Sequence, residues 1–369
     1  MTLTQRQLIE LIKLALGVDC DRSIFTAIDI QALFDAAQGQ TVLGLAIDGL
    51  ERLSRPLPNR EDRMILFSWI GAREVILQQN VLHKKTLRRI HELLKNNGIQ
   101  EVFMKGVTVA LRYPSPLHRA VGDIDFVVAR RDFKRTLKTL EEIAKVDYDL
   151  VHEHHGMAHI GDITLEPHYK VHNYQYEAND KAMHEIFDEV FPNKLRFVDI
   201  DGEQIPMFPP TMESVFLISH MVNHVYEEGL GLRQVIDYRQ LLEKDGGKID
   251  WTLHTEYLQR MHMTRAFHTF TRICETYLGL STDICNLQYT NSEKQLADKM
   301  MDDIMNVGNF GRNAYIFDHS SKWGEAKNYL WVLSRCIRLG GLCRTESMSW
   351  PLAKAKRYLW KKSVKKRNE

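Results

Sequence analysis

Hydrophobic side chains in the first quarter of the chain recur at helical spacing. From about Ala27 to Asn97 they repeat at steps of three and four residues, which gives each helix one apolar face. The preceding sequence, MTLTQRQLIELIKLAL, predicts an amphipathic helix rather than the apolar core of a signal peptide. The last helix ends at LLKNNG, where Gly98 offers the left-handed conformation that follows many helices. The pattern predicts a helical region over residues 1–97.

Short strands follow Gly98. Residues Ile99–Met104 predict a strand, a brief helix runs from Gly106 to Leu111, and the alternating sequence DIDFVV predicts a second strand. The segment Asp132–Ala144 predicts a helix with one apolar face, and the carboxylate of Asp132 suits both its cap and its dipole. The middle of the chain therefore has an α/β pattern.

Two turn signals indicate strand pairs further along. Gly161-Asp162 separates the predicted strands Asp149–Ile160 and Ile163–Tyr169. Asp201-Gly202 separates the strand-like sequences LRFVDI and QIPMF in the same way. We expect both pairs to be antiparallel.

Helical patterns resume after these strands. Thr211 predicts a helix cap, with Pro210 just before it, and the pattern continues to the C-terminus. The expected fold class is α+β, with a small mixed β-sheet core flanked by helical regions. The expected units are an N-terminal helical region (1–97), the core (98–208) and a C-terminal helical region (209–369).

Composition and charge narrow the class of protein. Lys and Arg total 49 against 48 Asp and Glu, so no overall field attracts nucleic acid or membrane. The 44% hydrophobic and 26% charged residues are typical of a globular protein, and no apolar run approaches the ~18 to 20 residues that span a bilayer. Five cysteines without CxxC spacing indicate neither a disulfide framework nor a Cys-rich zinc site. We expect a cytoplasmic protein.

A carboxylate pair is the main candidate for chemistry. Asp123 and Asp125 lie two residues apart in a predicted strand, so both project from one face and can share metal ions. Gly106 opens a helix 17 residues before Asp123, where backbone N–H groups can receive a phosphate, and Lys105 adds a charge beside it. This combination is suited to a magnesium-bridged triphosphate. A two-metal site needs a third carboxylate, for which Glu166 in ITLEPHY is the first candidate.

Asp162 is the rival third carboxylate.

The order of strand, glycine-opened helix, DxD and later strand carboxylate resembles the nucleotidyltransferase superfamily of DNA polymerase beta type. More closely, KGVTVALRYPSPLHRAVGDIDFVV with LEPHY, HMVNH and LRQVID resembles a bacterial family of uncharacterised nucleotidyltransferases, over roughly Met64 to Leu242. The resemblance implies metal ligands at Asp123 and Asp125, a third carboxylate at Glu166, a phosphate loop at Lys105 and Gly106, and a substrate contact at Arg119.

The chain departs from the family pattern at the loop. The superfamily places a serine after the glycine, whereas Val107 follows Gly106 here. Pro167, after Glu166, cannot donate a ladder hydrogen bond and predicts an edge strand. These departures bear on phosphate binding and on how open the site is.

The predicted function is transfer of a nucleotidyl group from a nucleoside triphosphate such as ATP to a hydroxyl, with release of pyrophosphate. The expected cofactor is Mg²⁺ in a two-metal site, with Mn²⁺ as the alternative ion. The acceptor is unidentified and ranges from a small molecule to an RNA end or a protein hydroxyl. One rival is a nucleotide-binding or regulatory module without turnover. Another is a metal-dependent hydrolase that uses the histidines between His152 and His172.

Other polar residues have weaker signals. His220 and His224 have helical spacing but lack the glutamate of HExxH, which favours packing or hydrogen bonding. His168 shares a strand face with Glu166, so it is a candidate substrate-lining residue. Arg233 and Asp237 predict an ion pair within one helix, and the family resemblance adds a site-lining role. The basic tail AKAKRYLWKKSVKKRNE predicts a solvated end, with an anionic partner as the alternative.

Overall fold

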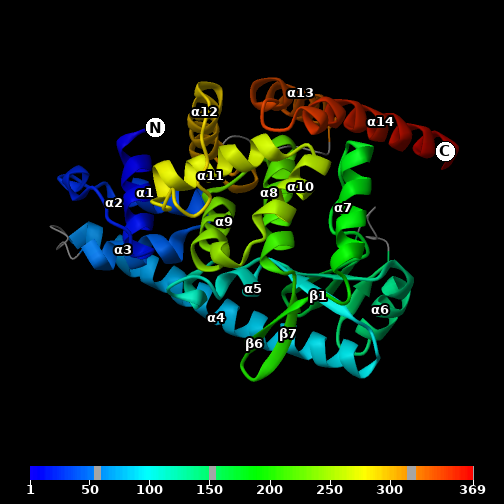
Figure 1. Cartoon of the computed structure of the whole chain (residues 1–369). Coiled ribbons are helices and arrows are strands. Elements are labelled where there is room, and N and C mark those ends of the chain that lie inside the picture. The colour runs from blue at the N-terminus through cyan, green and yellow to red at the C-terminus, as the bar shows by residue number, and fades with distance from the viewer. Residues whose placement is uncertain (54–59, 149–154, 314–320, 369) are drawn as a thin grey trace.

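The computed structural model describes residues 1–53, 60–148, 155–313 and 321–368, without the side chains of residues 322 and 357–368. In this described part, a seven-stranded mixed sheet is flanked by helices (Figure 1). The expected α+β fold is confirmed. The strands are β1 (Glu101–Met104), β2 (Ile124–Val128), β3 (Lys145–Asp147), β4 (Met157–Ile160), β5 (Ile163–His168), β6 (Arg196–Ile200) and β7 (Glu203–Met207).

The strand order is β3-β4-β5-β2-β1-β7-β6, so β2 and β5 lie inside the sheet. Strand β2 is antiparallel to β1, with Met104 opposite Asp125. It is parallel to β5, with Asp125 opposite Glu166. The predicted edge position of β5 is therefore wrong. Pro167 costs the ladder only one hydrogen bond, because Gly156, just before β4, lies opposite it and still donates its N–H to the Pro167 carbonyl oxygen at 2.9 Å.

Helices precede the sheet, connect some of its strands and follow it along the chain. The long helix α4 runs along one side of it, and α7, α8 and α9 lie on the other (Figure 1). The helices are α1 (Leu3–Ala15), α2 (Ile30–Gly39), α3 (Leu43–Leu53), α4 (Arg60–Asn96), α5 (Val107–Ala110), α6 (Phe133–Leu140), α7 (Glu177–Val190), α8 (Pro210–Glu227), α9 (Leu232–Asp245), α10 (Trp251–Arg260), α11 (Thr264–Leu278), α12 (Asn291–Val307), α13 (Lys322–Leu339) and α14 (Arg344–Asn368).

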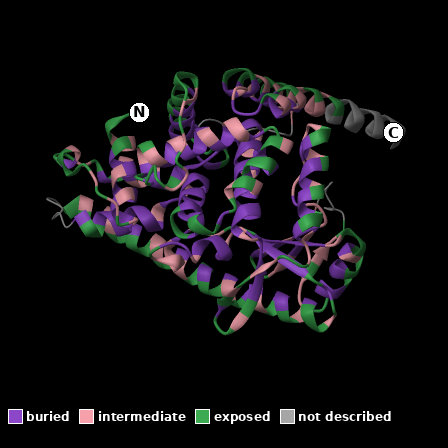
Figure 2. Ribbon diagram, in the orientation of Figure 1, coloured by how far each residue is buried: buried purple, intermediate pink, exposed green. Residues whose placement is uncertain are grey.

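Alternation along the strands separates two hydrophobic cores. Phe103 of β1 and Phe126 of β2 pack with α4 and α6, whereas Val102, Met104 and Val127 face the opposite core. That opposite core also joins residues of the N-terminal helices to residues of α8, α9, α11 and α12. Burial is concentrated where these helices meet the sheet and one another (Figure 2).

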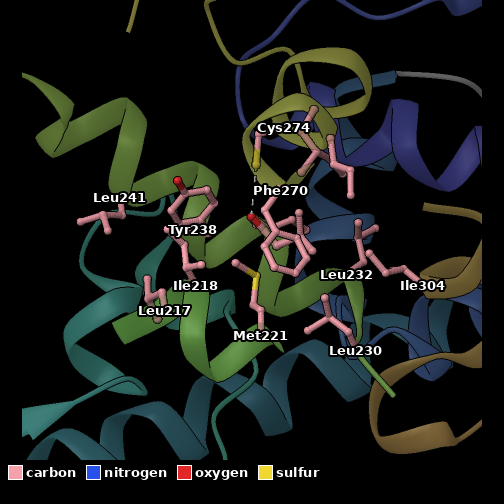
Figure 3. Packing of buried hydrophobic residues seen from close by; sticks show 14 of the residues in the cluster. Leu217, Ile218, Met221, Leu230, Leu232, Tyr238, Leu241, Phe270, Cys274 and Ile304 are labelled. Atoms are coloured by element: carbon pink, nitrogen blue, oxygen red, sulfur yellow. Dashed lines mark hydrogen bonds between the residues drawn. The ribbon is translucent and has the colours of Figure 1, made fainter. Parts of the chain in front are cut away.

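The close-up of this larger core shows how α8, α9 and α11 meet. Met221 of α8, Leu232 of α9 and Phe270 of α11 lie close together there, and all three are buried (Figure 3). Cys274 also lies there and, like the other four cysteines, is free. The helical flanks are thus packed together rather than attached separately to the sheet.

Local turn signals agree with the structure. Gly98 has a φ of +63° after α4, and Gly161 has a φ of +57° between β4 and β5. Both predicted hairpins pair as antiparallel strands. The predicted strand residues 149–154 lie outside the described residues. No helix in the described part of the chain combines the length and apolarity that a bilayer crossing requires.

The predicted cap at Thr211 is wrong. Helix α8 begins at Pro210 with Pro209 as its N-cap, and Thr211 lies inside the first turn. Its hydroxyl instead accepts a hydrogen bond from the Asp250 N–H at 3.0 Å. Proline suits the start of a helix because its missing N–H has no partner to lose there.

Candidate active site

Three carboxylates converge on the sheet face that carries the larger core. Because Ile124 and Phe126 face the smaller core, Asp125 between them faces the opposite way, toward α8. Glu166 of β5 lies opposite Asp125 in the parallel pair, so both side chains leave the same face. Asp123 directly precedes β2. The structure thus brings together the three predicted catalytic carboxylates.

The three carboxylates influence one another electrostatically. Asp123 is an exposed residue at the edge of the carboxylate cluster. Protein atoms nevertheless surround part of its carboxylate, and this partial burial raises its pKa. The negative charges of Glu166 and Asp125 raise it further, to about 6. Asp125 is only 6% exposed, and burial raises its pKa, but Lys105 and His168 outweigh burial and hold the pKa below its usual range.

The rival carboxylate, Asp162, lies elsewhere. It is exposed in the turn between β4 and β5. Four residues of extended strand separate it from Glu166, which corresponds to about 13 Å. Glu166 is therefore the better third carboxylate.

The loop after β1 lies beside these carboxylates. The Lys105 Nζ is 3.1 Å from Asp125 Oδ1. Continuation of the β1–β2 register places Gly106 opposite Asp123, and a Cβ added to Gly106 would lie 3.5 Å from the Asp123 carbonyl oxygen. Helix α5, which follows Gly106, has only four residues, so its dipole is small. Val107 is buried in the smaller core, so its side chain does not replace the missing serine.

His168 joins the carboxylates to a second imidazole. Its Nε2 lies 3.2 Å from Asp125 Oδ1 and 3.6 Å from Glu166 Oε2. Burial lowers the pKa of His168, but the hydrogen bonds to Asp125 and Glu166 outweigh it and raise the pKa. His155 pairs with His168 in an antiparallel bridge, with ring centroids 5.1 Å apart. Potential ligand atoms of His155, Glu166 and His168 all lie within 4.8 Å of one another. His152 and His154 lie outside the described residues.

Three further histidines form a row beside the site. The rings of His172 and His220 are 5.8 Å apart, and the Nε2 atoms of His220 and His224 are 3.0 Å apart. Burial lowers the pKa of all three, and the charge of Lys105 lowers it further, which places the row near the carboxylates. The pKa of His224 falls to about 3. The sequence predicts packing or hydrogen bonding for His220 and His224, but their proximity to Lys105 depends on how α8 packs on the sheet.

Arg119 is held within the protein. Its Nε and Nη2 lie 2.7 and 2.6 Å from the two carboxylate oxygens of Asp237 on α9. The Tyr113 hydroxyl donates to the same carboxylate at 2.5 Å. The structure therefore replaces the predicted Arg233–Asp237 pair with an Arg119–Asp237 pair. The predicted contact between Arg119 and the nucleotide gains no support from this arrangement.

Arg233 instead faces the loop before β2. Its Nη1 donates to the Ala120 carbonyl oxygen at 3.0 Å, and its charge lowers the pKa of Asp123. Burial and the charge of Arg119 lower the pKa of Arg233 to about 10, so it stays charged at neutral pH. Of the predicted lining residues, the structure brings His168 and Arg233 to the carboxylates, whereas Asp237 anchors the loop.

Helix α4 holds the same loop from the other side. The Asn80 side-chain amide donates to the Leu117 and Arg119 carbonyl oxygens at 2.9 and 2.8 Å. The His83 Nε2 lies 2.7 Å from the Gly122 carbonyl oxygen. Sequence reasoning missed Asn80 and His83, because nothing in a helical pattern shows which distant carbonyl a side chain reaches. The loop that leads to Asp123 is thus fixed from both helical flanks.

Comparison with known proteins finds one family and one solved structure to report. The model of a family described as uncharacterised nucleotidyltransferase matches residues 26–279. A solved structure, that of an antigenic nucleotidyltransferase-like protein from Paracoccidioides brasiliensis, is 12% identical, with a TM-score of 0.33 and coverage of 55% of this chain and 96% of that chain. No curated protein matches. The family match covers more than half of the sequence and contains every carboxylate of the site, so this chain belongs to the family of uncharacterised nucleotidyltransferases.

Proposed function

We propose that the protein is a magnesium-dependent nucleotidyltransferase that transfers a nucleotidyl group from a nucleoside triphosphate to a hydroxyl acceptor and releases pyrophosphate. The convergence of Asp123, Asp125 and Glu166 on one sheet face carries this proposal. Membership of the family supports it.

The donor atoms fit a hard divalent cation. The three carboxylates offer oxygen ligands, which Mg²⁺ prefers, and Mn²⁺ accepts the same ligands. Repulsion from Glu166 and Asp125 contributes to the raised pKa of Asp123, and a bound cation would relieve that repulsion. The carboxylate cluster is therefore electrostatically suited to a divalent ion.

Each residue has a role in the proposed reaction. The acceptor hydroxyl gives up its proton to solvent, and its oxygen bonds to the α-phosphorus while the bond from that phosphorus to the pyrophosphate oxygen breaks. Bound magnesium would neutralise phosphate charge and make the acceptor hydroxyl more acidic. Asp123 and Asp125 would hold the ion that binds the triphosphate, and Glu166 would help to hold the ion beside the acceptor hydroxyl. Lys105 and Arg233 supply positive charge around the phosphates.

The test combines a binding measurement with a turnover measurement. Thermal unfolding with ATP, GTP, CTP or UTP and Mg²⁺ measures binding, and label transfer from an α-labelled nucleotide to cell extract measures turnover. We expect one or more nucleotides to raise the melting temperature of the wild type. The Asp123→Asn, Asp125→Asn double variant should lose this shift and Glu166→Gln should lose transfer, since each removes a proposed ligand. Asp162→Asn is the matched control, because this exposed carboxylate lies away from the site. A wild type that no nucleotide stabilises would rule the proposal out.

Val107 supports a second candidate, a nucleotide-binding module without turnover. Its side chain is 4% exposed and packs in the smaller core, so the loop lacks the hydroxyl that the superfamily directs at phosphate. The test uses each of the four nucleotides, with cell extract as the source of acceptor. Stabilisation of the protein by a nucleotide without release of pyrophosphate would favour this candidate.

A further inference from the structure

Beside the aspartate pair, two imidazoles and one carboxylate meet. Glu166 and His168 lie two residues apart on β5, so their side chains share a face of the sheet. The antiparallel bridge places His155 next to His168. One ligand atom from each residue lies within 4.8 Å of the others. Ligand atoms bound at ~2.1 Å from one tetrahedral ion lie about 3.4 Å apart, so the ligand atoms of the triad have to approach one another by up to about 1.4 Å to close around an ion, a change that rotation of the side chains can supply.

The ligand types indicate which ions suit this triad. Mg²⁺ prefers oxygen ligands and keeps much of its water, whereas imidazole nitrogen suits zinc, iron, nickel and other first-row transition metals. Two histidines with one carboxylate also leave coordination positions open, as in catalytic rather than structural metal sites. The triad differs in this respect from the all-oxygen pair Asp123 and Asp125.

The surroundings of His168 fit a metal-bound imidazole. The Nε2 of His168 lies 3.2 Å from the buried Asp125 carboxylate. A carboxylate that accepts a hydrogen bond from one ring nitrogen orients an imidazole whose other nitrogen binds metal, so the Nδ1 of His168 would face the ion while its Nε2 stays on Asp125. Asp125 thus contacts both groups of ligands and connects them.

We propose that His155, Glu166 and His168 form a binding site for a divalent transition metal, so that the two ions of the active site differ in kind. This inference rests on the proposed function in one respect, because Glu166 is shared with the catalytic carboxylates. The oxygen-only position at Asp123 and Asp125 takes Mg²⁺ with the nucleotide, and the histidine position takes its ion without nucleotide. By the general order of metal affinities, Zn²⁺ binds there more tightly than Mn²⁺.

The test needs no nucleotide. Full-length protein is stripped with chelator and dialysed against Zn²⁺, Mn²⁺ or Mg²⁺, and bound metal is measured by mass spectrometry. Pulsed electron paramagnetic resonance of the Mn²⁺-loaded wild type then detects nitrogen-14 coupling from coordinated imidazole. We expect about one tightly bound Zn²⁺ or Mn²⁺ with nitrogen coupling. His155→Gln and His168→Gln should weaken binding by at least about tenfold, because loss of a second-shell partner alone costs 10–100-fold.

The control variant is His159→Gln. His159 belongs to β4, and its Nδ1 lies 3.5 Å from Thr164 Oγ1, outside the triad. The His159→Gln variant should bind metal as the wild type does. Circular dichroism checks that each variant is folded. The nitrogen coupling is measured on the wild type, so it does not depend on whether a variant folds.

The outcomes separate this site from the proposed function. Three outcomes would overturn the site: metal bound through oxygen alone, no tightly bound transition metal, or metal binding that is unchanged in His155→Gln. In each case, nucleotidyl transfer with Mg²⁺ alone would leave the proposed function standing. Nitrogen-coordinated metal in a protein that neither binds nor turns over nucleotide would sustain the site and overturn the proposed function.

Discussion

Asp125 on β2 and Glu166 on β5 lie opposite each other in a parallel strand pair inside the sheet. Their separation is set by the spacing of neighbouring strands, about 4.8 Å, rather than by a loop. Neutralising one carboxylate should therefore change the electrostatics of the cluster with little displacement of the backbone.

Glu166→Gln should lower the pKa of Asp123. Burial contributes most to the rise of this pKa to about 6, and the charge of Glu166 contributes next. Loss of that charge removes repulsion from ionised Asp123, so the pKa moves toward the ordinary value of 3.8. Carboxyl carbon-13 shifts of metal-free protein between pH 3 and 8 measure it. Asp162→Asn should leave the titration unchanged, and a Glu166→Gln curve identical to that of the wild type would contradict the expectation.

His224 should make the protein less stable in mild acid. Burial first, then the charges of Lys105 and Arg233, lowers its pKa from 6.5 to about 3. Its contribution to stability is present above pH 6.5 and is lost as pH falls toward 3, because the unfolded chain takes up the proton first. Between pH 7.5 and pH 5 the free energy of unfolding should fall by about 2 kcal/mol because of His224.

The measurement is urea unfolding of the wild type and His224→Gln at both pH values. The stability lost on acidification should be about 2 kcal/mol smaller in the variant. Ring-proton shifts of His224 in the folded protein should stay constant down to pH 5. A His224 titration near pH 6.5 would show that the ring is not held neutral.

Arg119→Met should destabilise the protein strongly even without nucleotide. It leaves Asp237, which is 4% exposed, without its bidentate partner, and breaking a buried pair in this way costs about 3–5 kcal/mol. Tyr113→Phe removes one hydrogen bond to the same carboxylate and should cost less, about 1.5–3 kcal/mol. Urea unfolding measures both. If Arg119→Met altered nucleotide binding but not stability, Arg119 would be a substrate contact instead.

Gly106→Ala should distort the loop beside Asp123. There is room for the methyl group, whose nearest neighbour, the Asp123 carbonyl oxygen, would lie 3.5 Å away. The backbone angles, φ +55° and ψ −124°, are nevertheless unfavourable for alanine, with a cost of about 1–3 kcal/mol. Thermal unfolding with and without Mg²⁺ and nucleotide should show lower stability and a smaller nucleotide-dependent shift.

Gly122→Ala is the control for this change. Gly122 precedes Asp123, has no atom within 4 Å of an added Cβ, and lacks a positive φ. We expect it to unfold and to respond to nucleotide as the wild type does. Equal effects of the two substitutions would show that backbone conformation at Gly106 is not the cause.

Local signals predict the individual parts of the site well. The two-residue spacing of Asp123 and Asp125 and the turn at Gly161 depend on strand alternation and backbone preference, which the residues themselves carry. Glu166 could also be proposed, because it occupies a short strand after that turn. The expectation at Pro167 failed because an inner strand tolerates one missing ladder bond when the neighbouring chain still pairs on both sides of it, as Gly156 does with the Pro167 carbonyl oxygen and His155 does with His168.

Long-range pairings were decided by the tertiary structure. The partner of Asp237 is Arg119, 118 positions away, rather than Arg233 on the same helix, because the burial and fork geometry of the pair outweigh proximity along the chain. The surroundings of His220 were also decided by the tertiary structure, because the packing of α8 on the sheet brings this histidine near Lys105. Side-chain spacing is local and periodic and can be recognised along a sequence. Which strand or helix becomes a neighbour depends on burying all the apolar faces at once, and only the folded chain settles that.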